Sequence, residues 1–165
     1  MIEEPLNIIR ELIEDSSKKI FVCIGNELRG DDEVGVHIGR RLKKTSLKDN
    51  VILAYNTPEN HIQEILEKDV ETVIFFDAVD VKASPGTIIL QEILPDKPSY
   101  ISISTHSIPI ETIVSIIESL SGKKMRFYII GVQAKNLDFG SKMSKEVVYA
   151  AKKLTEMIIK DIESK

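Results

Sequence analysis

Short runs of apolar, β-branched residues alternate along the chain with segments of helical periodicity. Residues 6–13 place Leu6, Ile9 and Ile13 on one helical face. Further helices are predicted over residues 33–42, 60–66, 110–120 and 144–162, and strands over 19–24, 51–55, 72–76, 87–94, 101–104 and 125–130. This alternation predicts an α/β fold, in which helices cover both faces of a mostly parallel central sheet. Because no repeat or linker interrupts the pattern, residues 1–165 are expected to form a single domain.

Local signals sharpen several boundaries. Asn60 and Ser144 are each placed to cap the helix that follows. The run from Thr72 to Phe76 is the most strand-like in the chain, and we expect that strand to stop at Asp77.

Composition and charge narrow the class of protein. A hydrophobic content of 42% over 165 residues is enough for one sizeable core. The formal net charge of −4 argues against a nucleic-acid partner, which normally requires a concentrated basic face. Cys23 is the single cysteine, so no intramolecular disulfide can form, and the chain shows neither a signal-peptide pattern nor a membrane-length apolar run. We therefore expect a cytoplasmic protein with no membrane span.

Polar residues follow the predicted strands, where sheets of this kind bind their ligands. Asp31 and Asp32 precede a helix, where capping explains one acid and leaves the other available for a second task. Asp77 follows two phenylalanines, and a buried carboxylate without a partner costs several kcal/mol, roughly. His106 lies between hydroxyl residues after the short run 101–104. Two carboxylates and one imidazole at strand ends suit a divalent metal such as Zn²⁺, Ni²⁺ or Mn²⁺ with open positions.

Other hydrolytic chemistries have no motif in this sequence. It contains no G-x-S-x-G, no H-E-x-x-H and no C-x-x-C. A phosphate-binding enzyme on a similar scaffold, such as a nucleoside phosphorylase, needs a cradle of glycines and arginines. Of the five arginines, only Arg29 lies in a motif loop, so this alternative is the weaker one.

Four ordered motifs resemble the hydrogenase maturation endopeptidases. Residues 25–32, GNELRGDD, are similar to the family signature G-N-x-L-x-G-D-D. Residues 77–80 with 84–86 are similar to its second motif, an aspartate after an apolar strand. Residues 104–109, STHSIP, resemble its histidine motif, and Gly131-Val132-Gln133 with Met143 matches its C-terminal pattern. The resemblance extends from about Phe21 to the last helix and leaves the N-terminal helix, residues 1–15, outside it.

The resemblance implies an α/β/α fold and a specific reaction. The family removes a C-terminal extension from the large-subunit precursor of a nickel–iron hydrogenase after nickel insertion. The resemblance implies that Asp32, Asp77 and His106 contact the metal and that Asp32 and Asp77 are catalytic. It also implies that nickel arrives with the precursor, although other divalent metals can occupy the site. Which carboxylate acts as base is left open. The spellings S-T-H and D-D are closest to the branch that serves formate-hydrogenlyase-type hydrogenases, the hydrogenase 3 branch.

Residues beside these three complete the predicted site. Gly25, Asn26, Asp31, Asp80 and Thr105 are expected in the surrounding loops or behind the ligands. Glu33 replaces a glycine that is common in the family, so it is an alternative to Asp32 as the first ligand. The same ligands would also serve a nickel-binding checkpoint module that does not cleave its partner, and sequence does not separate the two functions.

Overall fold

The computed structural model describes residues 3–95, 97 and 108–164. Its helices are α1 (Glu3–Glu14), α2 (Val34–Leu42), α3 (Ile62–Glu67), α4 (Ile110–Ser121) and α5 (Lys145–Glu163), with 3₁₀ turns η1 (Gly30–Glu33), η2 (Lys48–Asn50) and η3 (Pro58–His61). Its strands are β1 (Lys19–Ile24), β2 (Val51–Tyr55), β3 (Thr72–Val79), β4 (Ile88–Glu92) and β5 (Arg126–Gln133). The predicted strand over 101–104 lies outside the described residues.

The strands form one sheet in the order β2-β1-β3-β5-β4. The pairs β1–β2, β1–β3 and β3–β5 are parallel, and β4, the last strand in the order of the described sheet, runs antiparallel to β5. The central strand β3 is buried along its whole length, as expected for a parallel strand covered on both faces. The predicted mostly parallel sheet is confirmed.

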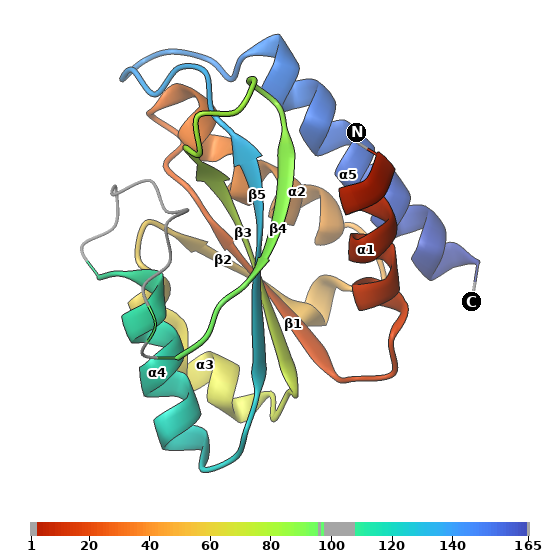
Figure 1. The fold of residues 1–165 in the computed structure, drawn as a ribbon, viewed down its shortest axis with the longest axis vertical. Helices are drawn as coiled ribbons and strands as arrows, with labels where there is room; N and C mark the ends of the chain where they lie inside the picture. The colour runs from red at the N-terminus through yellow and green to blue at the C-terminus, as the bar shows by residue number, and fades with distance from the viewer. Residues whose placement is uncertain (1–2, 96, 98–107, 165) are drawn as a thin grey trace.

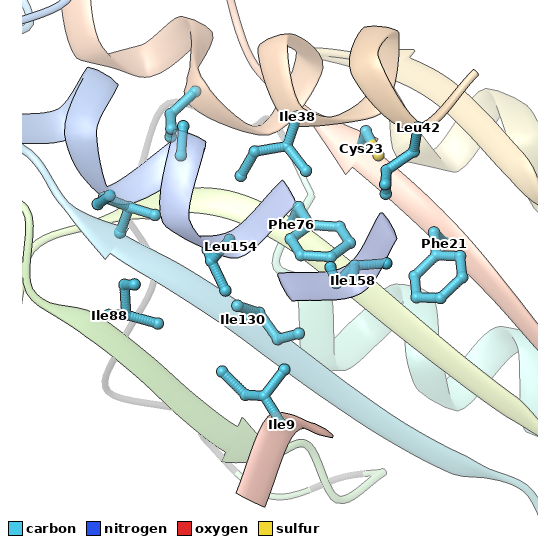
Figure 2. Packing of buried hydrophobic residues seen from close by; sticks show 14 of the residues in the cluster. Ile9, Phe21, Cys23, Ile38, Leu42, Phe76, Ile88, Ile130, Leu154 and Ile158 are labelled. Atoms are coloured by element: carbon cyan, nitrogen blue, oxygen red, sulfur yellow. The ribbon is translucent and has the colours of Figure 1, made fainter. Parts of the chain in front are cut away.

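Helices cover both faces of this sheet and give a single-domain, three-layer α/β/α fold (Figure 1). Helices α1, α2 and α5 cover one face, where Phe21 and Phe76 stack with ring centroids 5.9 Å apart. Figure 2 shows this layer, with Ile38, Leu154 and Ile158 of the helices packed over strand residues. Helices α3 and α4 cover the other face, around Phe75 and Phe127. Side chains alternate between the two cores along each strand, which is what a strand's period of two requires.

Two local predictions were wrong, and a third was right in position but not in its hydrogen bond. Strand β3 does not stop at Asp77 but continues to Val79, because β5 pairs with it as far as Gln133. Asn60 does not cap α3, because η3 occupies that position and His61 is the N-cap residue, without a side-chain cap bond. Ser144 is the N-cap residue of α5, yet its side chain makes no cap bond to that helix because it bonds elsewhere.

Candidate functional site

The carboxyl ends of β1, β2, β3 and β5 lie together because these strands run parallel. This end is at the top of the view in Figure 1, where η1 and the segment between β5 and α5 meet. The predicted site residues that the structure describes lie on the loops or strand ends at this edge: Gly25, Asn26, Asp31, Asp32, Glu33, Asp77 and Asp80.

The turn after β1 brings the backbone into close contact with η1. Asn26 donates its backbone N–H to the Asp32 carbonyl at 3.1 Å, and its side-chain oxygen accepts from the Leu28 N–H at 2.9 Å. A Cβ on Gly25 would lie 2.3 Å from the Asp32 carbonyl oxygen. Only glycine therefore permits the approach that seats Asp32 against the end of β1. This is a physical reason for the Gly25-Asn26 pair in the first motif.

Asp31 is a buried anchor for the segment between β5 and α5. Its carboxylate accepts hydrogen bonds from the backbone N–H groups of Lys135 (2.8 Å), Asn136 (2.9 Å) and Ser144 (2.6 Å). The Ser144 hydroxyl donates a further bond of 3.0 Å, and the Asp31 N–H donates to the Asn136 carbonyl at 2.9 Å. A carboxylate that accepts several N–H bonds is a strong organising group. Asp31 thus fixes one loop of the site to the other, which is why the first of the two adjacent acids is there.

Asp32 and Asp77 are both buried at the carboxyl end of the sheet. Asp32 is fully buried on η1, which contacts β3, and Asp77 is 2% exposed on β3 itself. A Cβ on Gly35 would lie 2.3 Å from the Phe76 carbonyl oxygen, so the first turn of α2 packs directly on the backbone before Asp77. One Asp77 oxygen accepts from the Ala78 N–H at 2.8 Å. The structure therefore brings the two predicted carboxylates to one end of adjoining elements.

Strand alternation places Asp77 on the same face as Phe75 and Val79, the face covered by α3 and α4. Its partner in the sheet is Gly131, where a Cβ would lie 2.5 Å from a Val79 methyl group. Helix α4 follows the segment that contains Thr105 and His106, which both lie outside the described residues. Within the described part of the chain, no group of three or more His, Cys, Asp or Glu side chains is placed to hold a metal ion.

Glu33 belongs to a different cluster from Asp31. Its carboxylate lies 3.5 Å from Arg40, which also pairs with Glu27. Burial raises the pKa of Glu33, Arg40 opposes this shift, and Glu27 adds to it. The partly buried Glu33 side chain is therefore held by Arg40.

Gln133, a residue of the C-terminal motif to which the sequence assigned no role, fixes the loop after β3. Its amide oxygen accepts from the N–H groups of Val81 (2.8 Å) and Ala83 (3.3 Å), and its nitrogen donates to Asp80 at 3.2 Å. The backbone N–H of Lys82 lowers the pKa of Asp80, as do Gln133 and the Lys82 side chain. Asp80 is exposed, and its carboxylate accepts from the Lys82 N–H at 3.1 Å within this loop.

The sequence reasoning also passed over the loop after β2. The Gly25 N–H donates to the Tyr55 carbonyl at 2.9 Å, so residues 56–61 begin at the same sheet edge. Pro58 is buried and Glu59 is partly buried there. A polar turn that follows a predicted parallel strand is the signal that could have assigned this loop to the candidate site.

Comparisons with known proteins agree with this fold. The family model for HycI, hydrogenase maturation protease, matches residues 36–161. A Methanocaldococcus jannaschii protein, MJ0253, provisionally named a hydrogenase maturation protease, is 30% identical over 151 residues that cover 87% of this chain and 96% of the relative. A second protein of that organism, MJ0631, has the same description and is 26% identical. The match covers 94% of this chain and 95% of that protein.

Solved structures give the same result. The crystal structure of the [NiFe] hydrogenase maturation protease HycI from Thermococcus kodakarensis superposes with a TM-score of 0.81 at 25% identity, over 94% of this chain and 99% of that one. HybD from the same organism gives a TM-score of 0.69 at 23% identity, over 87% and 97% of the two chains, which supports the fold alone.

Proposed function

The chain belongs to the hydrogenase maturation protease family, and we propose that it is the endopeptidase that removes the C-terminal extension of a nickel–iron hydrogenase large-subunit precursor after nickel insertion. The observation that carries this proposal is the pair of buried carboxylates, Asp32 and Asp77, at one end of adjoining elements. Two carboxylates at the carboxyl end of a mostly parallel sheet lie where such sheets bind their ligands. Carboxylate oxygens can coordinate a divalent cation, and a precursor that presents nickel supplies one.

The donor chemistry of the site fits a metal that arrives with the substrate. Asp32 and Asp77 offer carboxylate oxygens, and His106, outside the described residues, is proposed as the imidazole ligand. Glu33 is paired with Arg40, which favours Asp32 as the first ligand. Nickel bound there would supply Lewis acidity next to the scissile carbonyl.

The chain's own residues would handle the proton. In peptide hydrolysis a water oxygen bonds to the carbonyl carbon, the C–N bond breaks, and one proton of that water ends on the leaving nitrogen. Asp32 or Asp77 would accept that proton and return it to the nitrogen. Gly25 and Asn26 would hold Asp32 in place, and Asp31 and Asp80 would hold the neighbouring loops. Thr105, next to His106, is proposed to support the histidine.

Two narrower statements belong to the same proposal. We propose that the chain belongs to the hydrogenase 3 branch, which is supported by the S-T-H and D-D spellings of its motifs and by the match to the HycI family model. We also propose a cytoplasmic location. Among the described residues, no helix combines the length and apolarity required to cross a membrane.

The test is cleavage of a nickel-loaded large-subunit precursor followed by mass spectrometry. Asp32→Asn, Asp77→Asn and His106→Ala should each lower kcat by about 100-fold or more, because each removes a group that holds the metal or moves the proton. Asp49→Asn is the matched control, since Asp49 is an exposed acid on η2, before β2 and therefore at the opposite end of the sheet. A wild-type protein that binds the loaded precursor without shortening it would instead be a checkpoint module.

A further inference from the structure

A groove lies beside the candidate site, between the turn after β1 and the segment that precedes α5. Its volume is about 540 Å³, and its walls include Leu28, Glu33, Gly140, Met143 and Val148. The chemistry proposed above uses none of these five residues. Glu33 entered it only through its ion pair with Arg40, which left Asp32 as the first ligand.

The rim of this groove exposes large apolar side chains. Phe139 is 74% exposed and Leu28 is 67% exposed, the two highest values for large apolar residues in the described part of the chain. The Gly140 N–H donates to the Leu28 carbonyl at 2.8 Å, so these two loops are joined at the rim. Neighbouring apolar side chains that stay exposed on a folded protein commonly mark a surface that binds a partner.

The exposed side chains stand on a rigid support. The Arg29 guanidinium lies over the Phe139 ring at 5.3 Å, and the Asn136 amide donates to the Ser141 hydroxyl at 3.2 Å. Behind them, Asp31 accepts bonds from both ends of the same segment, at Asn136 and Ser144. A surface fixed in this way loses little conformational freedom when it binds, which favours affinity.

The groove and the site share the turn η1. Glu33 lines it, while Asp32, the preceding residue on η1, is one of the two buried carboxylates. A protein chain that reaches Asp32 therefore has this groove next to it. Resting on the proposed function, we propose that the groove docks an apolar segment of the large-subunit precursor, with Leu28 and Phe139 as its main contacts.

The charges around the groove suit such an occupant. Glu27 and Glu33 share Arg40, so their charge is partly neutralised within the protein. Lys142, which also lines the groove, is exposed. The docked segment is therefore mainly apolar and carries an acidic group that faces Lys142.

The experiment uses the double variant Leu28→Ser/Phe139→Ser. Both side chains are exposed, so its melting temperature should match the wild type. Its Kd for the nickel-loaded precursor and its KM in cleavage should each rise at least about tenfold, because the two main apolar contacts are lost, while kcat at saturating precursor stays within about twofold. Leu120→Ser is the matched control: Leu120 is 63% exposed near the carboxyl end of α4, far along that helix from the site.

The outcomes separate this inference from the proposed function. If the wild type cleaves the precursor and the double variant has the same Kd and KM, the docking proposal is overturned and the protease survives. If the wild type binds the precursor without cleaving it and the double variant binds tenfold more weakly, docking is supported and the protease fails. If the wild type self-associates and the double variant does not, a second copy occupies the groove, and the docking proposal is again overturned.

Discussion

Replacing Asp31 by alanine tests whether this carboxylate holds the segment between β5 and α5 in place. The substitution removes the acceptor from three backbone N–H groups, those of Lys135, Asn136 and Ser144. A donor left without its partner costs roughly 1–3 kcal/mol when buried. These three donors are part-buried, so water can reach them to some extent, and the lower half of that range applies. The free energy of unfolding should therefore fall by about 3–6 kcal/mol.

Such a loss is large against the roughly 5–15 kcal/mol by which domains are stable. It corresponds to a fall in Tm of about 6–24 °C for a chain of this length. Urea unfolding followed by circular dichroism measures the change directly. Asp31→Asn keeps one oxygen but turns an amide N–H₂ toward other donors, so it should lose about 2 kcal/mol, less than alanine.

Hydrogen exchange shows which amides lose protection when Asp31 is replaced, and a substitution of a neighbouring acid serves as the control. The amides of Asn136 and Ser144 should lose protection in Asp31→Ala, while those of β3 keep theirs under native conditions. Asp138→Ala changes an exposed acid in the same segment and should alter stability by no more than about 0.5 kcal/mol. If Asp31→Ala costs less than about 1 kcal/mol, the carboxylate does not hold this loop, and the role assigned to Asp31 is wrong.

Three further predictions follow from buried or paired groups. Gly35→Ala should destabilise the protein by at least about 3 kcal/mol in urea unfolding, because the new Cβ would lie 2.1 Å from the Ile24 carbonyl oxygen; a variant of near wild-type stability would contradict this packing. Burial raises the pKa of the Cys23 thiol, so a thiol reagent at pH 8 should modify it only after unfolding, and rapid labelling of the native protein would refute its burial. The pKa of Asp15 lies well below its ordinary value, since bonds from Lys19, Ser17 and Arg126 outweigh the opposing effect of burial. This depressed pKa stabilises the fold above the unfolded pKa of about 4, so the stability difference between wild type and Asp15→Asn should shrink in urea titrations as the pH falls from about 5 to 2; a constant difference would exclude the pairing.

The sequence by itself determined the elements and their class. Each described strand was found within three residues of its observed ends, because burial on both faces demands continuous apolar runs that periodicity detects. The candidate site residues could be found from the same pattern, because the ligand sites of parallel sheets lie directly after the strands. The roles of Asp32, Asp77 and His106 stay predictions until cleavage is measured.

Only the tertiary structure decided how the two adjacent acids divide their tasks. Asp31 and Asp32 are chemically identical and consecutive in sequence, and local rules for helix ends apply to both. Asp31 became the anchor because the segment around Asn136 and Ser144, more than 100 residues later, presents its N–H groups there. In the same way β3 runs past Asp77 because β5 continues beside it. Hydrogen-bond partners so distant along the chain leave no periodic trace in a local window, so pairing of this kind appears only when the chain is folded.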